Sequence, residues 1–175
     1  MLVTGISGAG KSTVCDALHA RGYEAHDIDL DGNAAWINRQ TGRSWPPDQR
    51  PDTGAPDWFE QYEWRVVPEK VEALAARARD QLIFLAGMAS NGHEVWHLFS
   101  RVIYLSIDEP TLRRRIESRT TNDFGRTSNE LAAILEWHEF AERQHRQAGA
   151  TIIDATLPSD RVVDAVLEAS LEEGN

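Results

Sequence analysis

The sequence predicts an α/β fold in which a parallel sheet is covered by helices on both faces. Strand and helix patterns alternate along the 175 residues, which is typical of βαβ units. Continuous apolar runs, of the kind that a strand buried on both faces needs, occur at residues 82–86, 102–105 and 152–153. The chain also begins with a short apolar run that leads into a glycine-rich loop and then a helical pattern.

The elements are expected in the following order. Strands are predicted at residues 1–4, 24–28, 81–86, 102–106 and 151–153. Helices are predicted at residues 11–21, 31–40, 58–79, 111–118 and 129–147, with a last helix beginning near Pro158. Residues 41–57 concentrate glycine and proline with little apolar periodicity, so we expect a long loop there, of the kind that is usually functional or disordered.

The strongest functional pattern lies at residues 5–13, which read GISGAGKST and fit the phosphate-binding pattern G-x-x-x-x-G-K-[ST]. Its glycines let backbone N–H groups curl around an anion, and the N-terminus of the following helix adds partial positive charge. The alternative is a glycine-rich turn that only begins a helix, but the order of strand, loop and helix favours the phosphate site. Lys11 would reach the terminal phosphates and the Ser12 hydroxyl would hold Mg²⁺. The predicted nucleotide contacts are Ser7, Gly8, Ala9, Gly10, Lys11, Ser12 and Thr13.

Two carboxylates, Asp27 and Asp29, follow at the second expected strand. On a strand they point to the same side, and they emerge at the carboxyl edge of the sheet, where open α/β folds bind ligands. Carboxylates there can hold Mg²⁺ through water, accept a hydrogen bond from a substrate hydroxyl or take its proton. The alternative is a solvated turn in which Asp31 caps a helix, and for Asp31 itself we favour that interpretation. Residues 29–32 also fit the D-x-x-G of GTP-binding switches, but no N-K-x-D occurs, which favours ATP.

A basic segment at residues 113–119 contains Arg115 and Arg119 four positions apart, so that on a helix they share a face. Two guanidinium groups that converge on a phosphoryl group neutralise the charge that develops on its oxygens. The polar residues 120–126 that follow are typical of a closing lid. The alternative is a basic helix face that pairs with Glu109 and Glu117.

Together these motifs resemble those of the P-loop kinases of small molecules: nucleoside monophosphate kinases, shikimate kinase and gluconate kinase. Residues 5–13 match the P-loop, and Leu112, Arg115 and Arg119 match the lid pattern L-x-x-R-x-x-x-R. The resemblance covers nearly the whole chain in element order. It implies a three-layer α/β/α P-loop NTPase fold, with a five-stranded parallel sheet in the order 2-3-1-4-5. It also implies a single domain over residues 1–175, with an acceptor-binding segment at about 31–80 and a lid at about 116–128.

The same resemblance implies roles for individual residues. Asp27 and Asp29 are similar to the D-x-D of shikimate-type kinases, in which the first carboxylate serves Mg²⁺ through water and the second binds the acceptor. Residues 153–156 resemble the strand-end segment that contacts adenine through its backbone, so Asp154 and Ala155 are expected at the nucleotide.

The acceptor motifs depart from those of the resembled families. Shikimate-type kinases carry F-R-x-x-E, whereas here Trp64 and Arg65 are followed by a glutamate one residue late, at Glu69. The glycine pair after the third strand is replaced by Gly87-Met88, and the D-G-x-P-R of adenylate-kinase-type enzymes is absent. The acceptor is therefore left open between a nucleoside monophosphate and a hydroxylated metabolite, and Arg65 and Gly87 are the acceptor-side candidates.

Composition excludes several other classes. The formal net charge of −10 argues against a nucleic-acid surface, since duplex binding needs clustered cations. The single cysteine, Cys15, cannot form an internal disulfide and is expected to be packed in the core. No segment approaches the roughly 20 apolar residues of a membrane span, and no signal peptide is recognised at the N-terminus. The expected location is the cytoplasm.

Two further patterns have competing interpretations. Residues 93–97 read HEVWH and fit the H-E-x-x-H zinc signature, but little helix is available between Gly92 and the strand near Val102. Six tryptophans are first expected in the core; Trp45 and Trp58 flank the proline-rich loop and could instead line an acceptor pocket. His138 and His145 are expected on the surface of a polar helix.

The sequence therefore predicts a Mg²⁺- and ATP-dependent kinase of a small molecule. The predicted catalytic residues are Lys11, Asp27, Arg115 and Arg119; Ser12 and Asp27 serve the metal, and Asp29, Arg65 and Gly87 serve the acceptor. The alternative functions are a nucleotide-dependent ATPase switch without a metabolite acceptor and, more remotely, a zinc hydrolase.

Overall fold

A computed structural model of the chain describes residues 1–30, 32–78, 81–120 and 122–171. The central sheet has five strands, all parallel to their neighbours, in the order β2-β5-β1-β6-β7. They are β1 (Leu2–Thr4), β2 (Glu24–Asp27), β5 (Ile83–Ala86), β6 (Val102–Ser106) and β7 (Thr151–Asp154). Counted along the chain without the strands of a separate hairpin, this order is 2-3-1-4-5. The α/β class and the five parallel strands agree with the sequence prediction.

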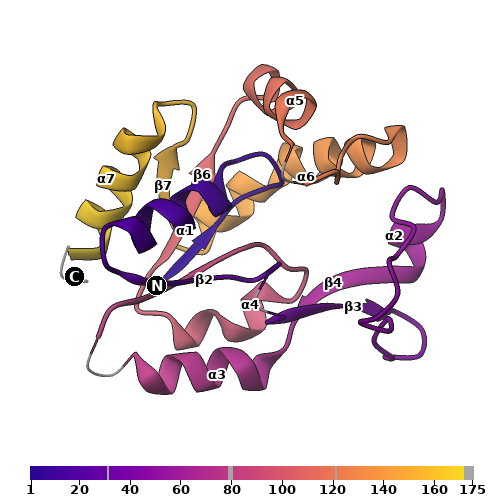
Figure 1. Cartoon of the computed structure of the whole chain (residues 1–175), viewed down its shortest axis with the longest axis horizontal. Helices are drawn as coiled ribbons and strands as arrows, with labels where there is room; N and C mark the ends of the chain where they lie inside the picture. The colour runs from indigo at the N-terminus through magenta and orange to yellow at the C-terminus, as the bar shows by residue number, and fades with distance from the viewer. Residues whose placement is uncertain (31, 79–80, 121, 172–175) are drawn as a thin grey trace.

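Helices cover both faces of this sheet (Figure 1). The helix α1 (Lys11–Ala20) lies beside α7 (Ser159–Leu171) on one face. The helices α3 (Pro68–Arg77), α4 (Gly92–Val95) and α6 (Ser128–Gln147) lie on the other, and the 3₁₀ helix η1 (Trp96–Leu98) follows α4 directly. The helix α5 (Glu109–Ser118) follows β6 at the carboxyl edge of the sheet.

The alternation of side chains along the central strands forms two hydrophobic clusters. Val3, Phe84 and Ala86 pack with apolar residues of α1 and α7, and Cys15 belongs to this cluster, as the sequence suggested. Leu2 and Leu85 point the other way and pack with apolar residues of α3 and α4. Because both faces of the sheet are buried, the strands need the continuous apolar runs that the sequence shows.

A two-stranded antiparallel hairpin stands apart from the main sheet and corrects two sequence predictions. The predicted helix at residues 31–40 is instead β3 (Ala34–Asn38), and its expected cap, Asp31, lies outside the described residues. The predicted long helix at 58–79 is three elements: α2 (Trp58–Gln61), β4 (Tyr62–Val66) and α3. Trp36 pairs with Trp64 in the register of the hairpin.

Local sequence explains why β4 and α3 replace one long helix. Pro68 stands at the first turn of α3, where a missing N–H is tolerated, whereas inside a helix it would remove a hydrogen bond and clash with the preceding turn. A proline also keeps the preceding residue extended, and Val67 has φ −90° and ψ 104°. Aromatic and β-branched residues alternate at Tyr62, Trp64 and Val66, which is the period of a strand.

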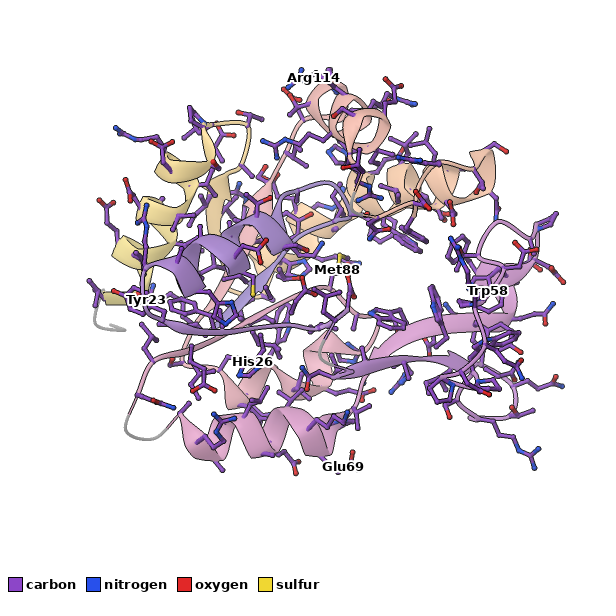
Figure 2. All side chains as sticks on the ribbon, viewed as in Figure 1. Tyr23, His26, Trp58, Glu69, Met88 and Arg114 are labelled. Carbon is purple, nitrogen blue, oxygen red and sulfur yellow. The ribbon has the colours of Figure 1, made fainter. Side chains whose placement is uncertain are left out.

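The long segment between β3 and β4 is held by stacked aromatic rings. Trp58 stacks on Tyr62 at 4.4 Å between ring centroids, and Trp45 meets Trp58 edge-on at 5.1 Å. Figure 2 shows Trp58 in this outer arm of the molecule, well away from Met88 beside the central sheet. Among the described residues, no helix combines the length and the apolar character needed to cross a bilayer.

Candidate functional site

The loop between β1 and α1 has the geometry that the glycine pattern predicts. Gly8 and Gly10 have φ of +89° and +99°, which side-chain-bearing residues rarely adopt. A Cβ on Gly8 would also lie 3.3 Å from the Ile116 side chain of α5. Gly10 is the N-cap of α1 and has no side chain to cap the helix. The N–H groups of the first turn are therefore left for an external anion.

Ser12, Asp27 and Asp29 form a connected group at the carboxyl edge of the sheet. The Ser12 hydroxyl donates to Asp27 Oδ2 (2.7 Å), and the Asp29 backbone N–H donates to Asp27 Oδ1 (2.8 Å). Asp27 is 7% exposed, so these contacts fix its carboxylate. Mg²⁺ binds to proteins through a few oxygen ligands and keeps several waters and substrate phosphates, and this hydroxyl–carboxylate pair fits that requirement.

Lys11 points across the mouth of the loop, and its Nζ donates to the Ile6 carbonyl (3.0 Å). Burial lowers the pKa of Lys11, and the charges of Asp29 and Asp27 oppose this shift. The Asp29 side chain is exposed where the two cavities open, but the protein atoms around its carboxyl group displace part of its hydrating water. This desolvation raises the pKa of Asp29, against the opposing charge of Lys11. A carboxylate with a raised pKa accepts a proton more readily.

Arg115 and Arg119 converge on the same loop from α5 and its C-terminus. Arg115 donates to the carbonyls of Ala9 (3.3 Å) and Ala155 (2.7 Å), and Arg119 donates to the Ser7 hydroxyl (3.1 Å). The remaining donors of Arg119, Nε and Nη2, are buried and have no hydrogen-bond partner within the described parts of the chain. Buried unpaired donors are rare and costly, so they indicate a missing acceptor of the size of a phosphate oxygen.

These groups line a cavity of about 520 Å³. Its walls include all seven loop residues from Ser7 to Thr13, both arginines, Asp29 and Ala155. Asp154 does not line it, because its carboxylate accepts hydrogen bonds from the backbone N–H (2.9 Å) and the hydroxyl (2.6 Å) of Thr156. Of the two nucleotide contacts predicted at this strand end, Ala155 therefore lines the cavity and Asp154 does not.

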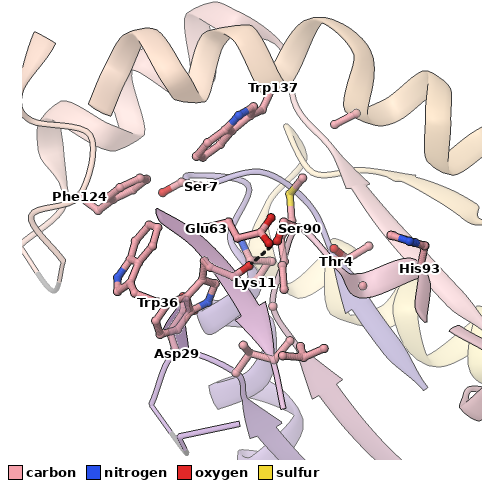
Figure 3. Close-up of a pocket in the computed structure, with 18 of the residues that line it drawn as sticks. Thr4, Ser7, Lys11, Asp29, Trp36, Glu63, Ser90, His93, Phe124 and Trp137 are labelled. Atoms are coloured by element: carbon pink, nitrogen blue, oxygen red, sulfur yellow. Dashed lines mark hydrogen bonds between the residues drawn. The ribbon is translucent and has the colours of Figure 1, made fainter. Parts of the chain in front are cut away.

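A second cavity of about 840 Å³ opens on the other side of Lys11. It extends between the hairpin, the C-terminal ends of the central strands and α6. Figure 3 shows the side chains of Trp36, Phe124 and Trp137 around this cavity, together with Ser7, Lys11 and Asp29. Ser7, Lys11, Asp29 and Asn122 line both cavities, so the two cavities meet at these residues.

The two acceptor-side candidates from the sequence differ in position. Gly87 lines the second cavity, and a Cβ there would lie 2.5 Å from Ile28, so only glycine allows this close approach. Arg65 does not line either cavity. Instead it donates to Glu63 (3.0 Å) and to both oxygens of Glu94 (2.9 and 3.1 Å). Both sides of β4 contribute to this cavity, through Tyr62, Glu63 and Trp64, and these ion pairs hold the Arg65 guanidinium group away from it.

The tryptophans beside the proline-rich loop and the H-E-x-x-H segment have structural contacts instead of the alternative roles considered from the sequence. Trp45 and Trp58 do not line the second cavity and serve the aromatic cluster of the outer arm. Glu94 of the H-E-x-x-H segment pairs with Arg65, and no group of three metal-ligating side chains occurs in the part of the chain that the structure describes. His145 is half-buried, not on the surface as expected, and its ring lies 4.6 Å from that of Tyr104.

The sequence prediction missed most of the second cavity. Its walls contain aromatic residues from the hairpin, from the segment before α6 and from α6 itself, as well as Arg39 and Glu63. The period-two pattern of residues 62–66, ending before Pro68, is the signal that would have found the hairpin. The other contributions come from residues far apart in the sequence, which no local pattern brings together.

The comparisons with known proteins agree with this architecture. The family model described as "AAA domain" matches residues 1–136. No curated protein matches the chain. A shikimate kinase from Acinetobacter baumannii, solved in complex with shikimate, has a TM-score of 0.60 at 16% identity, and the alignment covers 98% of this chain and 94% of the other.

Two further solved structures are similar. A gluconokinase from Sinorhizobium meliloti has a TM-score of 0.51 at 19% identity, with 97% of this chain and 93% of the other covered. A deoxyadenosine kinase from M. mycoides with bound dATP has a TM-score of 0.53 at 15% identity, with 98% and 100% covered. At these identities the similarity shows a common fold. This chain belongs to the AAA-domain family and has the fold of the P-loop small-molecule kinases.

Proposed function

We propose that this protein transfers the terminal phosphoryl group of ATP to a hydroxyl group of a small molecule. The observation that carries the proposal is that two cavities meet at Ser7, Lys11 and Asp29. One cavity is formed by the phosphate-binding loop and two arginines, and the other by side chains suited to an organic molecule. A nucleotide in the first and an acceptor in the second would bring the reacting groups together at Lys11.

The residues would divide the work of positioning and charge stabilisation. The loop amides would hold the phosphates, Lys11 would follow the transferred group, and Ser12 with Asp27 would hold Mg²⁺, which supplies positive charge to the phosphate oxygens when bound. Arg119, with two donors free for phosphate oxygens, and Arg115 would neutralise charge that develops during transfer. Asp29 would orient the acceptor hydroxyl and receive its proton. We assign the acceptor-binding segment to about residues 31–80 and the lid to about 116–128.

Structural relatives support the same class of reaction. The solved structures of similar fold are of kinases that act on shikimate, gluconate or deoxyadenosine, as their names state. The alternative function, an ATPase switch, needs no second cavity beside Lys11, whereas a kinase does.

The test is coupling between ATP consumption and an acceptor. Purified protein with Mg²⁺ and ATP should release ADP slowly alone and at least tenfold faster with one member of a panel of hydroxylated metabolites, nucleosides and nucleoside monophosphates. Lys11→Ala should reduce the stimulated rate by about 10²–10³, whereas Arg143→Ala, at an exposed cation of α6 outside both cavities, should not. Stimulation by a protein partner, with no acceptor phosphorylated, would instead establish the switch.

A further inference from the structure

The walls of the second cavity are rich in aromatic side chains. They come from five separate stretches of the chain: Trp36, Phe59, Tyr62, Trp64, Trp96, Phe99, Phe124, Trp137 and Phe140. Phe59 meets Phe124 and Trp137 edge-on, at 6.0 and 5.5 Å between ring centroids, so these three rings pack together across the lid and α6. A cavity lined by aromatic rings favours an apolar, ring-containing molecule, by edge or face contacts and by excluding water.

The cations of this cavity are already neutralised by the protein's own carboxylates. Arg39 pairs with Glu63 (3.2 Å) and donates to the Phe59 carbonyl (3.2 Å). Arg50 stands at the solvent-exposed rim, 3.7 Å from Asp123. Lys11 belongs to the phosphate loop. Within the described residues, no other lysine or arginine lines the cavity.

The histidines do not change this balance. Burial lowers the pKa of His145, so its ring is neutral at pH 7. His93 is exposed on α4, on the opposite side of the cavity from Trp36 and Phe124 (Figure 3).

Carboxylates outnumber cations along the cavity. Asp29, Glu63, Asp123 and Glu130 line it, against Lys11, Arg39 and Arg50. Glu63 also pairs with Arg65 (3.0 Å), so the arginine that the sequence offered as an acceptor-side candidate is itself neutralised by a carboxylate. Apart from Lys11, which the phosphate loop uses, an anion in this cavity would lose its water and meet no unpaired cation among the described residues, which is unfavourable.

One polar group of the wall faces the proposed proton acceptor. The Trp64 indole N–H is buried, forms no well-aligned hydrogen bond within the described residues, and lies close enough to Asp29 to lower its pKa against the effect of burial. A buried N–H beside the proposed proton acceptor suits a neutral oxygen or ring nitrogen of a bound molecule.

We propose that the acceptor is a non-anionic alcohol with a planar aromatic or heteroaromatic ring, and that carboxylated or phosphorylated acceptors are rejected. This inference rests on the phosphoryl transfer proposed above and specifies its substrate class. In the reaction, the acceptor hydroxyl oxygen forms a bond to the γ-phosphorus, and the bond from that phosphorus to the β,γ-bridging oxygen breaks. The hydroxyl proton passes to Asp29, and the products are ADP and a phosphate monoester.

Matched pairs of compounds test the charge rule. Uridine and UMP, thymidine and dTMP, and 4-(hydroxymethyl)benzamide and 4-(hydroxymethyl)benzoate differ chiefly in an anionic group. Binding is measured by tryptophan fluorescence with the nucleotide cavity saturated by Mg²⁺ and the β,γ-imido analogue of ATP. We expect the neutral member of at least one pair to bind at least tenfold more tightly than its anionic partner. Equal or tighter binding of the anions, or no binding of any neutral ring compound, overturns the inference.

Two variants test the assigned walls. Trp36→Leu removes a ring from the cavity and should weaken binding of the neutral compound at least fivefold, whereas Tyr23→Leu, at a half-buried ring outside both cavities and outside the acceptor-binding segment, should not. Glu63→Gln removes the carboxylate that pairs with Arg39. The ratio of the affinities for the neutral and the anionic member of a pair should then fall at least fivefold, while the protein remains folded. An unchanged preference in Glu63→Gln would contradict the role given to this ion pair.

ADP release with the same compounds separates the two proposals. Stimulation by anionic acceptors alone leaves the kinase function standing and refutes the substrate class. Tight binding of neutral compounds without any phosphorylated product supports the character of the cavity and refutes the kinase.

Discussion

At the scale of single residues, Asp29 occupies the position on which the proposed phosphoryl transfer depends. It lies at the meeting point of both cavities, and partial desolvation raises its pKa while Lys11 opposes the shift. Asp29 therefore keeps some affinity for a proton even though the positively charged Lys11 lies close to it.

This predicts a pH dependence. As the proton acceptor, Asp29 must be ionised, so kcat/KM should fall as the pH falls through its pKa, which lies above the ordinary value of 3.8. Asp29→Asn should lower kcat about 10²-fold and remove this acidic limb. Asp16→Asn, at an exposed position of α1, is the control. A limb that persists in Asp29→Asn would assign it to another group.

Arg119 illustrates a residue whose role is clearer from the structure than from the sequence. The four-residue spacing predicted a shared helix face with Arg115, but Arg119 is the C-cap residue just after α5. Its extended backbone (φ −69°, ψ 145°) directs the side chain to Ser7, and two of its buried donors have no partner among the described residues. No periodicity reports such a change of direction at a helix end.

At the scale of elements, Glu130 joins three segments near the cavity. Its carboxylate accepts from the backbone N–H groups of Gly125 (3.0 Å) and Thr127 (3.2 Å), and from the hydroxyl of Thr53. Glu130 is 5% exposed and closes a capping box at the start of α6. The loop before β4 is thus attached to the segment that the sequence assigns to the lid.

The stability of this connection should depend on pH. Burial alone raises the pKa of Glu130, but the hydrogen bonds from Thr53, Gly125 and Thr127 together outweigh it and lower the pKa below 4.5. The stabilisation is therefore fully present above about pH 4.5 and is lost as the pH falls through the lower, folded-state pKa. Glu130→Gln should reduce the free energy of unfolding by about 2 kcal/mol at pH 7, and by less near pH 3. Denaturant unfolding of this variant and of the exposed Glu136→Gln provides the measurement and its control.

Sequence patterns predicted elements best where one local rule dominated. β6 was predicted with its observed bounds, because it is a continuous apolar run, and α6 differs by one residue at its start. The hairpin was missed because Val66, Val71 and Leu74 also fit a helical spacing, and the strand pattern together with Pro68 was not given priority. The segment adopts the strand period rather than the helical one because Val66 packs in the second core cluster. Most residues of that cluster are distant in sequence, so no local pattern shows this contact.

At the scale of the whole molecule, ATP should act as a stabilising ligand, because it would satisfy donors that the protein leaves buried and unpaired. With ATP and Mg²⁺ at 100 times the Kd, linkage gives about 2.7 kcal/mol of stabilisation. For a domain of this size we expect a rise in Tm of about 5–10 °C. Thermal unfolding of the protein and of Lys11→Ala checks this. A wild-type Tm that does not move with saturating nucleotide would refute the nucleotide site.

The phosphate loop and the paired carboxylates could be read from the sequence because their spacing is local. The acceptor cavity could not, since it is assembled from β3, β4, the segment before α6 and α6 itself, and its selectivity depends on which charges happen to pair. Arg65 is an example. Its residue type made it a candidate for binding the acceptor, but the sequence does not show that its guanidinium group pairs with Glu63 and Glu94.

The wall shared by the two cavities has a consequence for inhibition. Since Ser7, Lys11 and Asp29 border both spaces, a compound that fills one cavity lies beside the other and can be extended toward it. A bisubstrate inhibitor, made by tethering an aryl alcohol to adenosine through a short polyphosphate bridge, would gain from the high effective concentration of its second half once the first is bound. The length of bridge that gives the tightest complex would then indicate the distance between the bound adenosine and the acceptor hydroxyl.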